Sequence, residues 1–258
     1  MRVMALYGYM KNTESRKAAI VTGSSRGIGA AIAKRLAGEG YAVVVNYAGR
    51  VADAQGVVQE IESAGGRAVA IQADVSVAAE VAALFDQAEK LFGGVDVLVN
   101  NAGVIQPGLV PLAETEDAQF DKIVSINLKG TFNTLRVAAK RLRQGGRIVN
   151  FSTSVVGLGL PGYAIYAATK SAVETMTNIF AKELRGREIT VNAIAPGPTA
   201  TELFLKGKTD EQVAHLAKMP PLERLGQPDD IAGVVAFLVG PNGGWVNGQT
   251  LRANGGIV

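Results

Sequence analysis

The chain of 258 residues contains no cysteine and a single histidine. Without cysteine it can form no disulfide, no thiolate nucleophile and no cysteine-ligated metal site. A Ser-His-Asp hydrolase would depend on His215 alone, which lies in a polar segment and is better interpreted as a surface residue. We therefore expect neither a metal centre nor a hydrolase of this kind.

Aromatic residues are also scarce, at 6%, and the net charge is only +3. Nucleic-acid binding usually needs a concentrated basic face, whereas here Lys and Arg are spread along the chain apart from one modest stretch, Arg136–Arg147. No apolar run approaches the roughly 20 residues of a transmembrane helix. These absences predict no nucleic-acid partner, no membrane partner and a cytoplasmic protein.

The first residues, 1–16, are mildly apolar and then polar, without a small-residue cleavage site, so we expect no signal peptide. We interpret them as an extension outside the fold, with Met10 as an alternative start. Residues 17–258 contain no linker rich in Pro, Gly and Ser and no internal repeat. They are predicted to form one domain.

What the chain has in abundance is short β-branched apolar runs that alternate with longer helical patterns. Near-continuous Val, Ile and Leu is typical of parallel strands covered on both faces. The predicted strands are Ala18–Thr22, Ala42–Tyr47, Arg67–Gln72, Val95–Asn100, Arg147–Phe151, Thr190–Ala195 and Gln249–Arg252. The predicted helices are Gly27–Glu39, Asp53–Ala64, Val77–Phe92, Asp117–Arg143, Ala164–Arg185 and Asp229–Val239. This alternation predicts a single-domain α/β fold, a Rossmann-type doubly wound parallel sheet of about seven strands flanked by helices.

The β-α rhythm breaks between Pro196 and Pro228, where four prolines stand between positions 196 and 221. Long irregular stretches in compact domains are usually functional or mobile. We therefore expect a substrate lid around residues 198–220.

A glycine-rich turn, Thr22–Gly29, follows the first predicted strand and precedes a helical segment. Its Gly-x-x-x-Gly-x-Gly spacing lets the backbone approach a pyrophosphate, and the helix start offers free N–H groups and a positive dipole end. A purely structural turn is the alternative. The residues expected to bind a dinucleotide here are Gly23, Ser24, Ser25, Arg26, Gly27, Ile28 and Gly29.

The end of the second strand indicates which dinucleotide is bound. NAD enzymes usually place an acid there to bind the ribose hydroxyls. Here Asn46 and Tyr47 end the strand and are expected to contact the cofactor, and no acid follows before Asp53. With Arg26 in the turn and Arg50 beyond the strand, the sequence favours NADP(H). A solvated loop arginine remains the alternative for Arg26.

Tyr166 and Lys170 lie four residues apart in a predicted helix and so share one face. A phenol titrates near ~10 in water, and a nearby ammonium lowers that pKa. Tyr166 is therefore the expected proton donor to a carbonyl oxygen, and a hydroxyl at Ser154 would hydrogen-bond the same oxygen. Taken alone, a Tyr and a Lys at this spacing are more often a surface pair.

With these motifs the chain resembles the short-chain dehydrogenase/reductase family from about Lys17 to its end. The matching motifs are Thr22–Gly29, Asp74-Val75, Asn100–Gly103, Ser125–Asn127, Ser154, Tyr166-x-x-x-Lys170 and Pro196-Gly197. The resemblance implies a catalytic tetrad of Asn127, Ser154, Tyr166 and Lys170. It also implies that two of these four, Tyr166 and Lys170, contact the cofactor. Further cofactor contacts are implied for Asp74, Val75, Asn101, Ala102, Gly103, Pro196, Gly197 and Thr199.

One departure from the family pattern concerns the serine. Many members place it thirteen positions before the tyrosine, which here selects Thr153. The local pattern Ser154-Val155-Val156-Gly157 matches the family's serine directly, with a loop one residue shorter. We favour Ser154, and Thr153 is the alternative.

The loops expected around the substrate are Val104–Leu112, Val155–Tyr163 and Thr199–Met219, and their apolar content indicates an apolar or mildly polar ketone. The chain is broadly similar to 3-oxoacyl-carrier-protein reductases, which implies reduction of a 3-oxoacyl thioester or similar carbonyl to a secondary alcohol. The alternatives are a reductase or dehydrogenase of a small ketone, sugar or polyol, and a non-catalytic dinucleotide-binding sensor.

Two partners remain to be considered besides the small-molecule carbonyl substrate. An acidic acyl carrier protein would suit the basic stretch Lys129, Arg136, Lys140, Arg141 and Arg143, which could equally be a solvated helix face. The family resemblance also implies a homotetramer.

Overall fold

The computed structural model describes residues 16–258, so residues 1–15 of the predicted N-terminal extension lie outside the described part. The fold is a seven-stranded parallel sheet in the order β3-β2-β1-β4-β5-β6-β7. Its strands are β1 (Ala18–Val21), β2 (Ala42–Tyr47), β3 (Arg67–Gln72), β4 (Val95–Asn100), β5 (Leu142–Phe151), β6 (Thr190–Pro196) and β7 (Thr250–Ala253). The predicted doubly wound α/β fold is confirmed.

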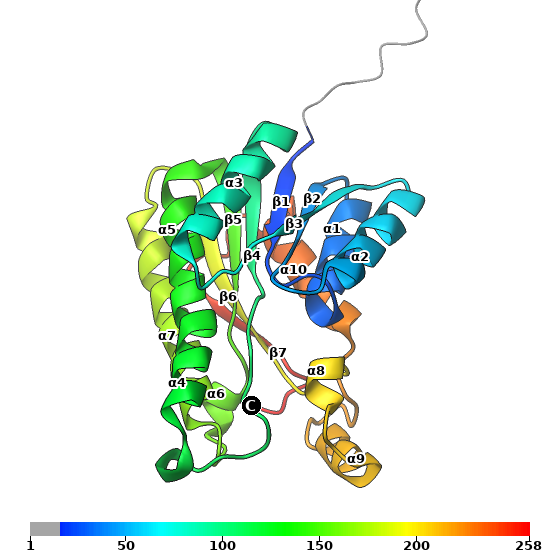
Figure 1. Ribbon diagram of the computed structural model, residues 1–258, viewed down its shortest axis with the longest axis vertical. Coiled ribbons are helices and arrows are strands. Elements are labelled where there is room, and N and C mark those ends of the chain that lie inside the picture. Colours follow the sequence, from blue (N-terminus) through cyan, green and yellow to red (C-terminus); the bar gives the residue numbers. More distant parts are fainter. Residues whose placement is uncertain (1–15) are drawn as a thin grey trace, which may run out of the picture.

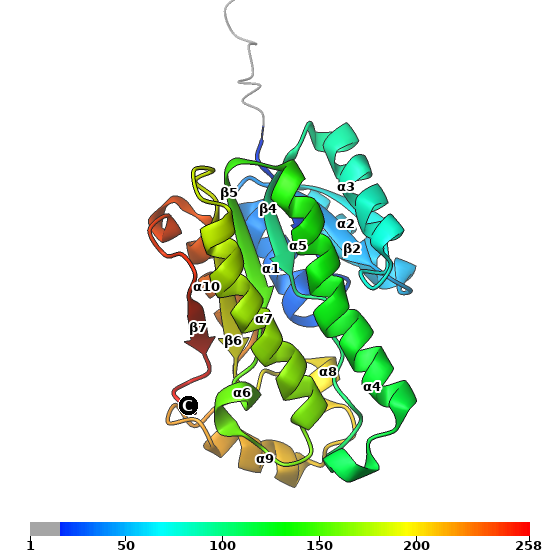
Figure 2. The same ribbon diagram turned by 90° about the vertical axis from the view of Figure 1, so that its left-hand side faces the viewer.

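Helices cover both faces of the sheet (Figures 1 and 2). One face carries α1 (Gly27–Gly38), α2 (Val51–Ser63) and α10 (Pro228–Val239). The other carries α3 (Ala78–Phe92), α4 (Asp117–Ile123), α5 (Gly130–Arg141) and α7 (Ala164–Glu183). The short elements are α6 (Val155–Leu158), α8 (Glu202–Leu205), α9 (Asp210–Lys218), and the 3₁₀ turns η1 (Leu112–Glu114) and η3 (Pro241–Gly243).

The core is divided by the sheet into two apolar clusters. Side chains alternate between the faces of a strand, so Ala19 and Val21 pack toward α1 and α10, while Ile20 between them packs toward α3 and α5. All three are buried. Because both faces are covered, the strands are apolar on both sides, which explains the near-continuous Val/Ile/Leu runs.

The chain leaves β1 for β2 on one side and returns to β4 on the other side of β1. In open α/β sheets a ligand crevice forms at such a switch point, outside the carboxyl ends of the strands. The glycine-rich turn after β1 and the segment after β4 both lie there. The topology therefore places the predicted cofactor residues at one edge of the sheet.

The predicted helix Asp117–Arg143 is interrupted and ends earlier. A π-helical turn, η2 (Val124–Lys129), separates α4 from α5, and the chain enters β5 at Leu142. Leu142 pairs with Val95, after which the register shifts before the regular pairing begins. The sequence prediction captured only this regular part of the strand.

The expected lid region is not irregular throughout, because it contains α8 and α9. The Thr201 hydroxyl accepts a hydrogen bond from the Phe204 N–H at the start of α8. Thr209 and Gln212 form a capping box at the start of α9. Within residues 16–258, no helix combines the length and the apolarity needed to cross a membrane.

The glycine-rich turn generates a stability prediction. A Cβ on Gly29 would lie 2.5 Å from Asn101 Nδ2 and 2.6 Å from the Gly23 carbonyl oxygen. Gly29→Ala should therefore lower the free energy of unfolding by about 1–3 kcal/mol in urea denaturation. The matched control is Gly56→Ala in α2, where nothing lies within 4 Å of the new Cβ. It should raise stability by about 0.5–1 kcal/mol, and equal effects of the two substitutions would contradict the steric argument.

Candidate active site

The glycine-rich turn is fastened to the end of β4 by a network around Thr22. The Thr22 hydroxyl accepts the N–H groups of Asn101 and Ala102, at 3.1 and 3.0 Å. In return, Asn101 Nδ2 donates to the carbonyl oxygens of Thr22 and Gly23, at 2.9 and 3.0 Å. A Cβ on Gly23 would lie 2.8 Å from Ala102 Cα, and its φ is +61°. Glycine is therefore required where these two segments meet.

Three predicted cofactor ligands turn their side chains inward instead. The Ser24 hydroxyl donates to the Val21 carbonyl at 2.7 Å. Asn46 accepts the Gly23 N–H through Oδ1 and donates to Ile71 and Ala73 through Nδ2. Tyr47 is 9% exposed and belongs to the core. The Ser24 and Asn46 side chains thus hold the turn in place, and contact of these residues with the cofactor stays a prediction.

The remaining turn residues suit a pyrophosphate. Ser25, Arg26, Gly27 and Ile28 are partly exposed at the start of α1, and no side chain caps that helix. The first N–H groups of a helix have no partner within it, and they carry the positive end of its dipole. An anion bound there would receive hydrogen bonds from the backbone.

On the adenine side, the predicted contacts Asp74 and Val75 lie just after β3, separated from it by Ala73. Asp74 Oδ1 accepts hydrogen bonds from the Ser76 N–H and hydroxyl, at 2.8 and 2.7 Å. Val75 is buried and packs against Gly130, where an added Cβ would come within 2.6 Å of its side chain. The half-buried Asp74 carboxylate is the polar group that this segment presents beside the turn.

The proton-transfer pair lies at the start of α7, after the end of β5. Lys170 is 4% exposed, and its Nζ donates to the Phe151 carbonyl at 2.8 Å. The same Nζ lies 5.9 Å from the centre of the Tyr166 ring. The structure therefore brings the two predicted residues together on one helix face, as their spacing indicates.

Burial controls the protonation of both groups. Desolvation raises the pKa of Tyr166 to about 12, partly opposed by a side-chain hydrogen bond with Thr153. Desolvation lowers the pKa of Lys170 to about 8. The sequence predicted a lowered pKa for Tyr166, and this is wrong for the structure described because desolvation outweighs the opposing interaction with Thr153. The phenol is protonated at neutral pH, as a proton donor requires.

Asn127 lies in the π-helical turn η2 and is fully buried. Its side chain makes a pair of bonds with Val104, accepting the N–H at Oδ1 and donating to the carbonyl, both at 2.8 Å. A Cβ on Gly103 would lie 3.3 Å from Asn127 Oδ1 and 3.5 Å from Lys170 Nζ. The absence of a side chain at Gly103 thus lets Asn127 and Lys170 both approach the same backbone position.

The structure distinguishes the two candidate hydroxyl residues after β5. The Thr153 side chain lowers the pKa of the Tyr166 phenol, and its hydroxyl accepts the Val155 N–H at 3.3 Å. The Ser154 hydroxyl is directed elsewhere: it donates to the Ala195 carbonyl at 3.3 Å and accepts from Asn254 Nδ2 at 2.9 Å. These contacts favour Thr153, the alternative of the sequence prediction, and the choice between the two hydroxyls stays a prediction.

The nicotinamide-side segment, Pro196–Thr199, follows β6 and is equally close-packed. A Cβ on Gly197 would lie 2.8 Å from Asn254 Cα. The Thr199 hydroxyl donates to the Gly197 carbonyl at 3.0 Å and is buried. Asn254 also donates to the Val258 carbonyl, so the last residues of the chain brace this corner of the site.

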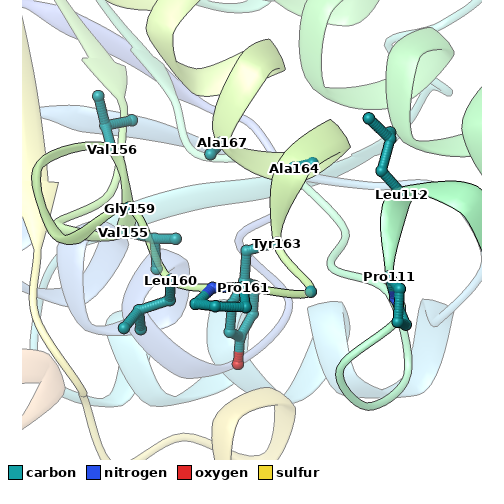
Figure 3. A pocket seen from close by; sticks show the side chains of 11 residues that line it. Pro111, Leu112, Val155, Val156, Gly159, Leu160, Pro161, Tyr163, Ala164 and Ala167 are labelled. Carbon is teal, nitrogen blue, oxygen red and sulfur yellow. The ribbon is translucent and has the colours of Figure 1, made fainter.

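Beside the proton-transfer pair lies a pocket of about 480 Å³. Figure 3 shows Pro111 and Leu112 on one side of it, and Val155, Leu160 and Tyr163 on the other. Tyr166 does not line the pocket, but its ring centre lies 6.5 Å from that of Tyr163. No charged side chain lines it. Two of the loops expected around the substrate therefore form an apolar pocket.

Gln106 was missed by sequence reasoning. It is 6% exposed, and its Nε2 donates to the Gly162 carbonyl at 2.6 Å, which joins the two pocket loops. Its Oε1 is buried without a hydrogen-bond partner among the described residues. No motif marked it, because its role depends on a contact between segments 56 positions apart. Among residues 16–258 no cluster of His, Asp or Glu is placed to hold a metal ion.

Comparisons with known proteins agree with this geometry. A family model described as enoyl-(acyl carrier protein) reductase matches residues 23–258. The chain belongs to the short-chain dehydrogenase/reductase family. It is 46% identical over 250 residues to a short-chain type dehydrogenase/reductase of Picea abies, which covers 94% of this chain and 92% of the relative.

Two further similarities are informative. The chain is 46% identical over 254 residues to an NADPH-dependent aldehyde reductase-like chloroplastic protein of Arabidopsis thaliana, covering 94% of each. A crystal structure of a short-chain dehydrogenase from Burkholderia cenocepacia in complex with NADP is 39% identical, with a TM-score of 0.87, and covers 93% of this chain and 97% of that one. The family resemblance stated from the motifs is confirmed, and the chain is an oxidoreductase of this family.

The assignment of Thr153 is testable by paired substitutions. Thr153→Val removes the hydroxyl at nearly constant volume and should lower kcat for a carbonyl substrate roughly 100-fold, whereas Thr153→Ser should retain most activity. Ser154→Ala should keep kcat within a few-fold but lower the free energy of unfolding by about 1 kcal/mol, because Asn254 loses an acceptor. Steady-state kinetics and urea denaturation measure both. An inactive Ser154→Ala together with an active Thr153→Val would restore Ser154 to the catalytic role.

Proposed function

We propose that this short-chain dehydrogenase/reductase is an NADPH-dependent reductase that converts an apolar ketone or aldehyde to an alcohol. The observation that carries the proposal is the protonated Tyr166 phenol, held beside the buried Lys170 ammonium and next to Tyr163, which lines an apolar pocket. A neutral phenol with a raised pKa is a proton donor at neutral pH. Reduction is the direction in which the enzyme must supply that proton.

NADP(H) is the cofactor that the described residues fit. The glycine-rich turn offers backbone N–H groups to the pyrophosphate, and two arginines, Arg26 and Arg50, lie beside it with no acid at the end of β2. An acid there would repel a 2′-phosphate, whereas guanidinium groups bind phosphate well. The relative from Arabidopsis thaliana is named for NADPH, and the Burkholderia cenocepacia structure contains NADP.

When bound, the nicotinamide supplies the hydride that reduces the carbonyl carbon. The protein's own residues handle the proton. Tyr166 donates its phenolic proton to the carbonyl oxygen as negative charge develops there, and the Thr153 hydroxyl hydrogen-bonds in the same place. The Lys170 ammonium, fixed by the Phe151 carbonyl, stabilises the phenolate that remains. Asn127 fixes the Val104 backbone next to this lysine.

The pocket supports an apolar carbonyl substrate. Its lining of Pro, Leu, Val and Tyr side chains would desolvate an alkyl chain or a ring and offers no cation to a carboxylate. A 3-oxoacyl thioester fits this description, and the chain is 43% identical over 243 residues to a 3-oxoacyl-[acyl-carrier-protein] reductase of Staphylococcus aureus, covering 93% of this chain and 98% of the relative. A small ketone or aldehyde unrelated to fatty-acid synthesis fits equally well.

The basic stretch gives only partial support to an acyl carrier protein as partner. Arg141 pairs with Asp86 and Glu89, both at 2.7 Å, and Arg143 pairs with Asp96 at 3.1 Å. Their charges are therefore largely neutralised within the protein. Lys129, Arg136 and Lys140 remain for an acidic partner, a smaller surface than the sequence suggested.

We also propose that the protein assembles as a homotetramer. Phe132 on α5 and Ile179 on α7 are about half exposed on one side of the molecule, and Trp245 near the C-terminus is 98% exposed. Exposed large apolar side chains on long helices are typical of subunit interfaces. The expected cytoplasmic location stays a prediction.

The reaction is tested with purified protein, NADPH and a panel of ketones and aldehydes, by following NADPH absorbance. We expect turnover of apolar carbonyls and a loss of about 100- to 10,000-fold in kcat for Tyr166→Phe, which lacks the donated proton. NADPH binding by Tyr166→Phe, measured by calorimetry, should stay within a few-fold of wild type. Tight NADPH binding without turnover across the panel would instead support the alternative of a dinucleotide sensor.

The pH dependence of reduction follows from the two shifted groups. The pKa of Tyr166, about 12, keeps the donor protonated throughout the working range, while Lys170, with a pKa of about 8, loses its charge as the pH rises. We expect kcat/KM for reduction to be level near neutral pH and to fall about tenfold per pH unit above about 8. Circular dichroism over the same range controls for unfolding. A level profile up to pH ~10 would contradict a role for the lysine charge.

A further inference from the structure

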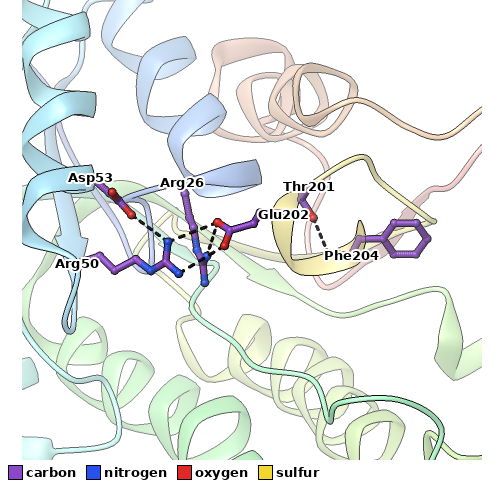
Figure 4. Close-up of polar contacts among 6 residues, drawn as sticks. All are labelled: Arg26, Arg50, Asp53, Thr201, Glu202 and Phe204. Atoms are coloured by element: carbon purple, nitrogen blue, oxygen red, sulfur yellow. Dashed lines mark hydrogen bonds and ion pairs between the residues drawn. The ribbon is translucent and has the colours of Figure 1, made fainter. Parts of the chain in front are cut away.

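An acidic residue of the lid region reaches the two arginines beside the glycine-rich turn. Glu202, the first residue of α8, pairs with Arg26 through Oε2 at 2.5 Å. The same carboxylate contacts Arg50 at 3.4 and 3.5 Å, and Arg50 also pairs with Asp53 at 3.2 Å. Figure 4 shows both guanidinium groups directed at the Glu202 carboxylate. The side chains of Arg26, Arg50 and Glu202, which come from three separate segments of the chain, thus meet near the start of α1.

The Thr201 side chain helps to hold the start of α8 in this position. The Thr201 hydroxyl fixes the first turn of α8 by accepting the Phe204 N–H at 3.2 Å. The Thr201 methyl group lies 3.5 Å from the position that a Cβ on Gly27 would take. The start of α8 therefore packs directly on the glycine-rich turn. Glu202 reaches the arginines because of where this helix begins.

The carboxylate is a true competitor for these arginines at neutral pH. Its hydrogen bond with Arg26 lowers the pKa of Glu202, so it stays ionised. Carboxylate and phosphate groups both take the paired N–H donors of a guanidinium. The four charges of Arg26, Arg50, Asp53 and Glu202 cancel. A ribose 2′-phosphate gains two cations at this position only when Glu202 releases them.

We propose that Glu202 is a specificity-determining residue that competes with the 2′-phosphate of NADP(H) for Arg26 and Arg50, and so couples the lid region to the type of cofactor bound. This inference rests on the proposed use of NADP(H). NADPH displaces the carboxylate and frees α8 from the turn. NADH has a ribose hydroxyl in place of the phosphate, so it leaves the Glu202 contacts intact. Glu202 therefore reduces the difference in affinity between NADPH and NADH that the two arginines create.

The decisive substitution is Glu202→Gln, which keeps the shape and removes the charge. The dissociation constants of NADPH and NADH are measured by calorimetry for wild type and variant at low ionic strength. NADPH should bind about two- to fivefold more tightly to the variant, the range expected for releasing an exposed ion pair. NADH should bind equally well or more weakly. The difference should shrink as salt is added, because these charges are exposed.

Two controls separate competition from a general effect on the lid. Glu211→Gln removes a like charge from α9 in the same region, away from the arginines, and should change neither constant. In an Arg26→Gln background, the gain from Glu202→Gln should largely disappear, because the strongest contact is already lost. A gain that persists in full in this background would overturn the proposal.

The remaining outcomes are also distinct. Two results would make Glu202 only a structural anchor: Glu202→Gln tightens the binding of both cofactors equally, or it leaves NADPH binding unchanged or weaker. If wild-type protein still prefers NADPH in either case, this inference alone fails. If wild-type protein binds NADH as tightly as NADPH, the NADP(H) preference under the proposed function fails with it. Thermal unfolding of the variants confirms that each is folded.

Discussion

The parallel direction of all seven strands is the constraint on which the site depends. Every strand ends at the same edge of the sheet, so each loop that leaves β1, β4, β5 or β6 starts within reach of its neighbours. The segments Thr22–Gly29, Asn101–Gly103, Thr153–Ser154 and Pro196–Thr199 are all loops of this kind. Hydrogen bonds between these loops, such as those of Thr22 with Asn101 and Ala102 after β4, then fix the positions of the loops relative to one another.

Desolvation decides the chemistry at this edge. Burial disfavours the charged form of both groups: it lowers the pKa of Lys170 and raises the pKa of Tyr166. The consequence is that a phenol protonated at neutral pH lies beside a lysine whose charge is lost as the pH rises above about 8. When negative charge develops on the substrate oxygen, the same low-polarity surroundings strengthen its attraction to the ammonium and the Thr153 hydroxyl.

The order of strands and helices could be predicted from the sequence because it follows from hydrophobic period and segment length, both of which are local. Tyr166 and Lys170 could be paired because helical spacing brings them together. The side-chain directions could not be predicted. Asn46 turns inward because three backbone groups of neighbouring segments need its amide, and the Ser154 hydroxyl is engaged by Asn254, a hundred positions away. The sign of the Tyr166 pKa shift depends on burial, which spacing does not reveal.

The acceptor that positions Lys170 is the main-chain carbonyl of Phe151. A point mutation changes a side chain and leaves the peptide group, so no substitution at residue 151 deletes this acceptor. The Asn127 contacts with Val104 are protected in the same way, since both are made to backbone atoms. The pocket loops, by contrast, are lined by side chains that mutation can exchange freely. Such a division lets the pocket lining change while the main-chain groups that position Lys170 and Asn127 stay in place.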